Sequence, residues 1–152
     1  IMILLASRAN AQTITVVHNL SFGRFATLNN NTAHTIVVQT NNTTSYDPDI
    51  ISDTDAQRGE YLFNDLPANV QFHVGVSTST PPSDGGLILD NATPVSLGGQ
   101  SFTLGSLTAT DLITDASGDG TMYVGGTLTT SGSGVNYNSG HYTGSFDITL
   151  YY

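Results

Sequence analysis

The side chains that could do chemistry in this chain are histidines and carboxylates, because the sequence contains no cysteine and no lysine. Enzymatic catalysis needs a nucleophile, a base and a group that orients the base, all within reach of one another. No Gly-x-Ser-x-Gly elbow, phosphate-binding loop or dinucleotide fingerprint occurs. The four histidines lie in predicted strands or beside turns: His18, His34, His73 and His141. We therefore predict no catalytic and no cofactor-binding residues, and a protein that is not an enzyme.

Calcium binding is the remaining chemistry to weigh, since this hard cation prefers several carboxylate oxygens and the acids here are clustered. Asp115 and Asp119 lie together in the loop DASGDG. A larger group lies within nine residues: Asp47, Asp49, Asp53 and Asp55. Neither group follows the calcium-loop pattern that ends in Glu. Solvated acids and Asx turns are the favoured interpretation, so no metal site is predicted, and the larger group stays the calcium candidate.

Two relations to sugars are considered: glycans attached to asparagine side chains and glycans bound by aromatic side chains. The sequon Asn-x-Ser/Thr begins at five positions: Asn19, Asn30, Asn41, Asn42 and Asn91. Chance produces such matches in a chain rich in Asn and Thr, so they matter only in a cell that glycosylates surface proteins. The seven tyrosines could stack on sugar rings, but packing in the core and between strands is the favoured role.

The composition limits the partners of the protein. Three arginines and twelve acidic residues give a formal net charge of −9, which repels nucleic acid and anionic lipid surfaces. Charged residues are only 10% of the chain, so its solvated faces must consist mostly of Thr, Ser, Asn and Gly. Without cysteine or lysine, neither disulfides nor Lys–Asn isopeptide crosslinks can form within the chain. Any assembly of this protein is therefore expected to be non-covalent.

Short apolar runs alternate with turn-rich breaks along residues 13–152, which predicts a single all-β domain built as a β-sandwich. No helix of about ten or more residues is evident. The segment Asn41–Gly59 is the longest irregular piece and is expected to be an exposed excursion. The predicted strands are Thr13–Val17, Leu20–Ala26, His34–Thr40, Glu60–Leu66, Val70–Ser77, Leu87–Leu89, Thr93–Leu97, Ser101–Leu104, Thr121–Leu128 and Tyr142–Tyr152.

The last predicted strand shows the clearest alternation of apolar and polar residues. One face carries four apolar side chains: Phe146, Ile148, Leu150 and Tyr152. We expect this strand to lie in the core, bordering either another strand or a groove where a strand is missing. By the same alternation, His73 is expected to point outward between Phe72 and Val74.

Residues 1–12 are predicted to form an arm separate from the domain. If the arm forms a strand, both of its faces are apolar. The residues of this apolar run are Ile1, Met2, Ile3, Leu4, Leu5 and Ala6. A run this short cannot span a membrane, which needs about 20 residues. The alternative is the remainder of an export signal, because Ala9-Asn10-Ala11 resembles a signal-peptidase site. Both interpretations favour a secreted protein of the cell surface.

Four segments resemble the bacterial secreted family known as domain of unknown function 4402. They are LSFG at Leu20–Gly23, the run Gly59–Val76, MYVGGTLT at Met122–Thr129 and the closing Gly140–Tyr152. The most specific are the hydrophobic-Val-Gly-Gly-Thr-Leu segment and the closing Gly-x-Tyr-x-Gly-x-Phe strand. The resemblance covers about residues 13–152 and implies an immunoglobulin-like, pilin-like sandwich that polymerises. The excursion at residues 41–59 is longer and more acidic than the family pattern leads one to expect.

These observations lead to two hypotheses of function. In the first, the protein is a filament subunit whose run Ile1–Ala6 is the donor strand, received by an acceptor groove at Phe146, Ile148, Leu150 and Tyr152. This is β-augmentation, and its head-to-tail contact generates an open homopolymer. In the second, the N-terminal strand completes its own sandwich, and the protein is a monomeric secreted module that binds carbohydrate or a surface protein.

Overall fold

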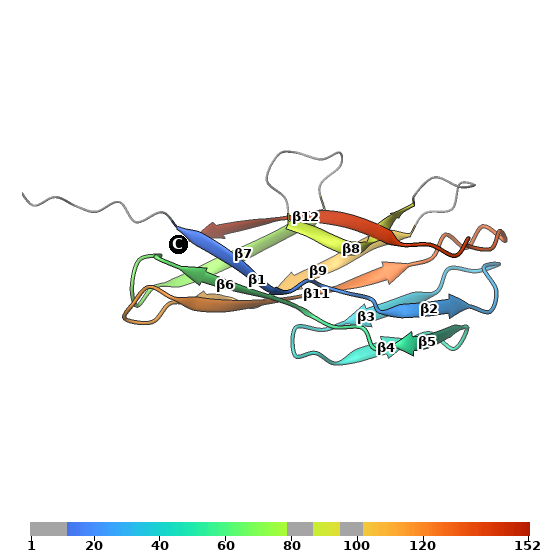
Figure 1. Cartoon of the computed structure of the whole chain (residues 1–152), viewed down its shortest axis with the longest axis horizontal. Coiled ribbons are helices and arrows are strands. Elements are labelled where there is room, and N and C mark those ends of the chain that lie inside the picture. The colour runs from blue at the N-terminus through green and yellow to red at the C-terminus, as the bar shows by residue number, and fades with distance from the viewer. Residues whose placement is uncertain (1–11, 79–86, 95–101) are drawn as a thin grey trace, which may run out of the picture.

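The computed structural model describes residues 12–78, 87–94 and 102–152 of the chain (Figure 1). Within these ranges the chain forms twelve strands and no helix, which confirms the all-β prediction. It follows that no helix in the described part is long and apolar enough to cross a membrane. The predicted donor residues Ile1–Ala6 lie outside the described residues.

The larger of the main sheets has six strands, and all of its neighbouring pairs are antiparallel. Its order is β1-β6-β11-β3-β4, with β9 also paired to β11. The strands are β1 (Thr13–His18), β3 (Thr35–Val38), β4 (Thr44–Tyr46), β6 (Gly59–Asn64), β9 (Thr103–Ala109) and β11 (Gly120–Thr129). The strand β1 therefore lies at one end of this order, with β6 as its neighbour.

A second, four-stranded sheet has the order β10-β7-β12-β8 and is also antiparallel. Its members are β7 (Gln71–Thr78), β8 (Leu87–Pro94), β10 (Leu112–Ile113) and β12 (Tyr142–Tyr151). The closing strand β12 is thus an interior strand of its sheet, between β7 and β8. The remaining strands, β2 (Arg24–Thr27) and β5 (Ile50–Thr54), pair with each other.

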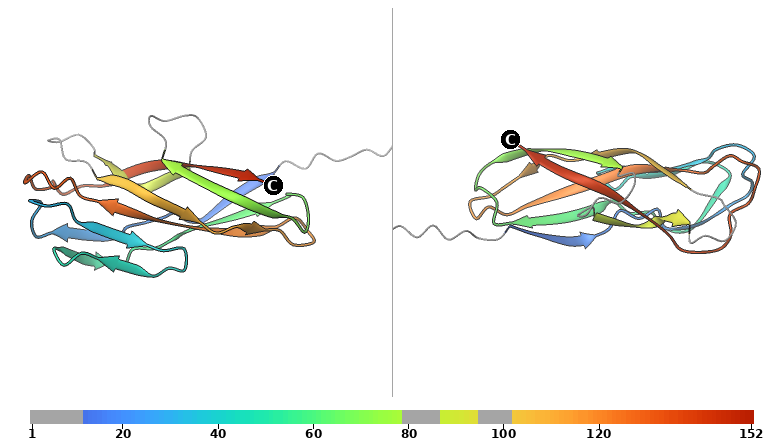
Figure 2. Two further views of the ribbon diagram at one scale, coloured as in Figure 1. Left: turned by 180° about the vertical axis from the view of Figure 1, so that it is seen from behind. Right: turned by 90° about the horizontal axis from the view of Figure 1, so that it is seen from above.

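The core lies between the two main sheets, which form two layers in Figure 2. Tyr61 of β6 and Phe146 of β12 are both fully buried, and their rings meet edge to face with centroids 6.2 Å apart. Other buried side chains of this cluster are Leu20, Phe22, Ile36, Val38, Phe63, Phe72, Leu112, Met122, Val124 and Leu128. Burial of these large apolar side chains is the main favourable contribution to folding.

The segment Asn41–Gly59 is more regular than the sequence indicated. It contains β4, which pairs with β3, and β5, which pairs with β2. Ile50 is buried with 7% of its surface exposed, whereas Ile51 is 53% exposed. The prediction of an irregular excursion was wrong because strands of three and five residues are too short to show a period.

The Val-Gly-Gly-Thr-Leu segment of β11 has a steric reason for its first glycine. A Cβ atom at Gly125 would collide with the carbonyl oxygen of Val38 on β3. We therefore expect Gly125→Ala to lower the free energy of unfolding by about 1–3 kcal/mol, measured by urea denaturation. Gly105→Ala on β9 is the control, since nothing lies within 4 Å of a Cβ there. Equal effects of the two substitutions would contradict this account of β11.

Candidate functional site

The two edges of β12 are not paired to the same extent. β7 pairs with β12 from Phe146 to Tyr151. On the opposite edge, β8 pairs with β12 only from Tyr142 to Phe146. From Asp147 to Tyr151 this edge has no partner strand among the described residues. We call this segment the open edge: its alternate residues direct backbone N–H and C=O groups away from β7, and within the described ranges, which leave out residues 79–86 just before β8, no strand pairs with them.

The strand β1 is uncovered on the side that faces into the molecule. Ile14 is opposite Phe63 and Val16 is opposite Tyr61 in the antiparallel pairing of β1 with β6. Directly opposite residues have their side chains on the same face of a sheet, and Tyr61 and Phe63 are buried in the core. Nevertheless Ile14 is 52% exposed and Val16 is 41% exposed. The second sheet therefore does not cover the inward face of β1.

The open edge of β12 and the inward face of β1 both lie next to one pair of aromatic rings, Tyr61 and Phe146. Val16 lies opposite Tyr61, and the ring of Tyr61 packs against Phe146, the last residue of β12 that pairs with β8. The open edge begins at the next residue, Asp147. A strand added there would extend the four-stranded sheet over the inward face of β1. The open edge has five residues, which at about 3.3 Å per residue suits a strand of ordinary length.

The four residues predicted to line an acceptor groove differ in how far they are buried. Phe146 is fully buried, so it has no surface left for an incoming strand. Ile148 and Leu150 share its face and are partly buried against the core cluster. Tyr152 is 90% exposed, and its ring lies 5.4 Å from that of Phe72. Ile148 and Leu150 are thus the candidates for contact with an added strand.

Two apolar residues of this site were not singled out from the sequence. Ile14 and Val16 alternate with Thr13 and Thr15, which is the ordinary signal of a strand with one buried face. The signal predicts an apolar face but does not tell whether the rest of the molecule covers it. Only the pairing of β1 with β6 and the measured exposure show that this face is left open.

The histidines are separated in the structure. His34 is nearly buried, with Nε2 3.5 Å from Asp49 Oδ2, and His73 lies on β7, with Nδ1 3.4 Å from Asp111 Oδ1. The side chain of His73 is 60% exposed, which confirms that it points outward. His18 ends β1 and His141 precedes β12, both exposed.

The aspartates of the larger acidic group engage different partners. Asp47 Oδ2 accepts a hydrogen bond from the backbone N–H of Thr35, and Asp49 Oδ2 accepts one from Asn29. Asp53 pairs at 3.4 Å with the exposed guanidinium of Arg24. Over the described ranges, no group of three or more His, Asp or Glu residues is placed to hold a metal ion. Calcium binding by Asp47, Asp49, Asp53 and Asp55 therefore gains no support from this arrangement.

The loop DASGDG is built on an Asx turn. Asp115 Oδ1 accepts hydrogen bonds from the backbone N–H groups of Ser117 and Asp119. These bonds, first that from Asp119 and then that from Ser117, lower the pKa of the Asp115 carboxyl because they favour its charged form. The carboxylate thus organises its own loop, the role that such residues commonly have in turns.

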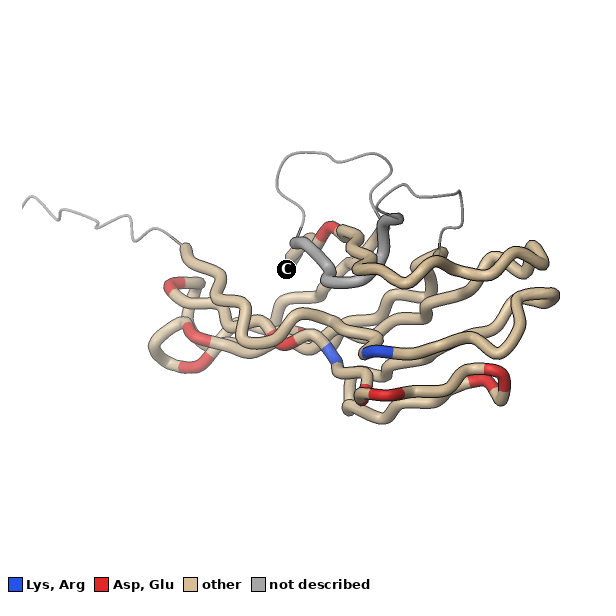
Figure 3. The backbone as a smooth tube through the Cα atoms, turned by 45° about the vertical axis from the view of Figure 1, so that its right-hand side comes forward, with Lys and Arg blue, Asp and Glu red and all other residues tan. Residues whose placement is uncertain are grey.

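The acidic residues lie at separate places in the fold, and the sequon asparagines differ in exposure. Figure 3 shows acidic positions on separate loops and strands, with the two described arginines on neighbouring parts of the fold. Asn30 is 1% exposed and its amide is bonded to Ser131 and Val135, so it cannot carry a glycan in this structure. Asn41 and Asn42 are exposed, Asn19 is half-buried, and the side chain of Asn91 is not described.

Tyr61 carries a buried hydroxyl with no hydrogen-bond partner among the described residues. Burial raises the pKa of this hydroxyl, and the backbone of Leu20 lowers it to a smaller extent, although its approach does not meet the geometry of a hydrogen bond. Since an unpaired buried hydroxyl is costly, we expect Tyr61→Phe to raise the free energy of unfolding by about 1 kcal/mol at neutral pH. Thermal and urea denaturation measure this effect, and a loss of stability would show that the hydroxyl is bonded after all.

The pH dependence of the same variant gives a second readout. The folded state holds the Tyr61 proton more tightly than the unfolded state does. The stability that this provides is complete below the ordinary tyrosine pKa of 10.0 and is lost as the pH rises through the higher folded pKa. The wild type should therefore lose stability relative to Tyr61→Phe as the pH rises above the ordinary tyrosine pKa of 10.0, and the difference between the two should widen there.

The described residues form an all-β fold with two main antiparallel sheets. The chain belongs to the family described as Domain of unknown function (DUF4402), whose model matches residues 13–152. The resemblance seen in the sequence is thereby confirmed, and the match includes every strand described above. Neither the curated proteins nor the solved structures gave a match to the chain.

Proposed function

We propose that the protein is a structural subunit of an extracellular filament, joined non-covalently by a strand that each subunit receives from its neighbour. The carrying observation is the open edge of β12 beside the uncovered inward face of β1. In an immunoglobulin-like, pilin-like sandwich with one incomplete sheet, a strand from another subunit would complete that sheet. The added strand would bond with the open edge and cover Ile14 and Val16.

The donor in this proposal is the apolar run Ile1–Ala6. Its alternation gives the incoming strand Ile1, Ile3 and Leu5 on one face, and each buried side chain would contribute about 1.5–3 kcal/mol before entropy is counted. The ladder of main-chain hydrogen bonds along β12 adds to this. Donor and acceptor are different surfaces, so the contact is head-to-tail and generates an open filament.

A donor strand that folded back onto the open edge of its own subunit would satisfy the same groups. The protein would then be a monomeric secreted binding module, for carbohydrate or another surface protein. The two possibilities differ in the molecule that supplies the strand, and therefore in the size of the particle at high concentration.

Electron microscopy of the full chain, beside a variant lacking Ile1–Ala9, distinguishes them. We expect filaments from the full chain and none from the shortened one. Circular dichroism of the shortened chain shows whether it has kept its β structure. Monodisperse particles in both samples would contradict polymerisation, and filaments in both would exclude residues 1–9 as the donor.

A further inference from the structure

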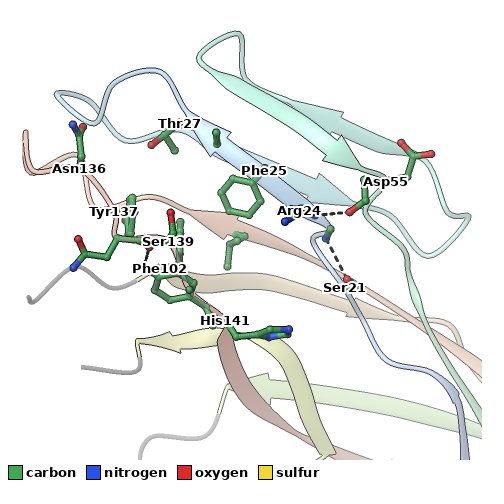
Figure 4. A pocket seen from close by; sticks show the side chains of 17 residues that line it. Ser21, Arg24, Phe25, Thr27, Asp55, Phe102, Asn136, Tyr137, Ser139 and His141 are labelled. Atoms are coloured by element: carbon green, nitrogen blue, oxygen red, sulfur yellow. Dashed lines mark hydrogen bonds between the residues drawn. The ribbon is translucent and has the colours of Figure 1, made fainter. Parts of the chain in front are cut away.

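A cleft of about 1030 Å³ lies between the two-stranded sheet β2–β5 and the segment 136–142 that leads into β12 (Figure 4). In Figure 1, β2 and β5 lie toward the opposite end of the molecule from the C-terminus, where β12 has its open edge. None of the residues that line the cleft belongs to the open edge, to Ile14 or to Val16. The cleft is therefore a separate feature and does not depend on polymerisation.

Aromatic rings from three segments of the chain form one cluster in this cleft. Phe102, just before β9, stacks on Tyr137 with centroids 4.1 Å apart and planes 7° apart. Phe25 of β2 and Tyr142 of β12 each meet Phe102 edge to face, at 5.5 Å and 4.8 Å. All four rings are half-buried, so they hold one another in place while part of their surface stays accessible.

The loop that carries Tyr137 is fixed by hydrogen bonds. The Tyr137 hydroxyl accepts a bond of 2.7 Å from the backbone N–H of Ser131. Buried Asn30 donates to the backbone oxygen of Val135 and accepts from the backbone N–H of Gly132. The Tyr142 hydroxyl donates to the backbone oxygen of Asn138. Such a preformed site loses little entropy when a ligand binds.

The rim of the cleft is polar but carries little net charge. Asn136, Ser139 and His141 are exposed on one side, as the close view in Figure 4 shows. Arg24 and Asp55 line the other side, and the guanidinium of Arg24 lies 3.4 Å from Asp53. With one arginine already beside a carboxylate and a chain charge of −9, the cleft is not suited to an anionic ligand.

We propose that this cleft binds a neutral oligosaccharide. Flat apolar ring faces and surrounding amides and hydroxyls match a sugar, which has apolar C–H faces and a rim of hydroxyl groups. A purely apolar ligand would leave the polar rim without partners. The volume slightly exceeds the roughly 300–1,000 Å³ range of small-molecule sites, which favours several sugar units over one.

Calorimetric titration of the full chain with neutral gluco-, xylo-, manno- and chito-oligosaccharides tests the proposal. We expect at least one of these sugars to bind. Tyr137→Ala removes the stacked ring and should weaken that binding roughly tenfold or more. Tyr137→Phe keeps the ring face, loses only the bond from Ser131, and should bind within about threefold of the wild type.

Two further variants separate recognition from folding. Asn136→Ala changes an exposed side chain at the rim and should weaken the sugar several-fold with an unchanged melting temperature. Tyr152→Ala removes an exposed aromatic ring far from the cleft and should leave the sugar affinity unchanged. The proposal is overturned if no neutral oligosaccharide binds, if only charged polysaccharides bind, or if Tyr137→Ala and Asn136→Ala both keep full affinity.

Discussion

Replacing Ile14 by lysine is expected to abolish filament formation while leaving the subunit folded. Ile14 is 52% exposed on the described subunit, so a lysine there can keep its ammonium group in water. In the filament the same position would be covered by the donated strand. The charged group would then be buried without a partner, which is costly.

Electron microscopy and light scattering measure this effect, with thermal unfolding to show that the fold is kept. Ile113→Lys on β10 is the matched control, because Ile113 is a strand isoleucine that is 66% exposed, and β7 lies between β10 and β12 in the sheet. We expect the control to form filaments as the wild type does. The account fails if Ile14→Lys assembles normally, or if both variants lose assembly alike.

Replacing Phe146 by alanine should produce the largest loss of stability among the changes considered, about 3–5 kcal/mol. Its side chain is fully buried, and its ring contacts Tyr61 across the two sheets. The substitution removes this contact and leaves a cavity at the start of the open edge. Urea denaturation of the chain measures the loss, with the slope of the transition as a check on two-state unfolding.

Tyr152→Ala is the control for this prediction, because Tyr152 belongs to the same predicted face but is 90% exposed. Its effect on the free energy of unfolding should be within about 0.5 kcal/mol. Comparable losses in the two variants would show that the C-terminal end of this face is packed as tightly as Phe146. That result would contradict the open edge.

The sequence predicts the long strands well, because their alternation extends over many residues. The predicted strand Thr121–Leu128 is β11, Gly120–Thr129, and the predicted strand Tyr142–Tyr152 is β12, Tyr142–Tyr151. Both lie in sheet interiors, where burial of one face enforces a period of two. The prediction that the last strand lies in the core is confirmed by the buried Phe146.

The candidate site was less predictable because it depends on pairing between distant segments. Local periodicity divided β8 into two short strands, Leu87–Leu89 and Thr93–Leu97, whereas the structure has one strand, Leu87–Pro94, and residues 95–97 lie outside the described part. Among the described residues, β8 pairs with β12 only as far as Phe146, and residues 79–86, which precede β8, lie outside the described ranges. That register is a property of the sheet, and no run of residues in β12 alone encodes it.

The aromatic cluster of the cleft was hidden for the same reason. Phe25, Phe102 and Tyr137 are far apart in the sequence, and none of them stands in a recognisable motif. The seven tyrosines raised sugar stacking as a general possibility without indicating which ones could take part. Their juxtaposition depends on where the loop before β12 comes to lie beside β2.

Mixing two variants that each keep half of the proposed contact tests the central claim most directly. The full chain with Ile14→Lys has the donor residues and a blocked acceptor, while residues 12–152 alone have an acceptor and no donor. Size-exclusion chromatography with light scattering should show monomers of each alone and a one-to-one complex in the mixture. Two monomers that remain separate when mixed, or filaments from either variant alone, would contradict donation of a strand from one subunit to the next.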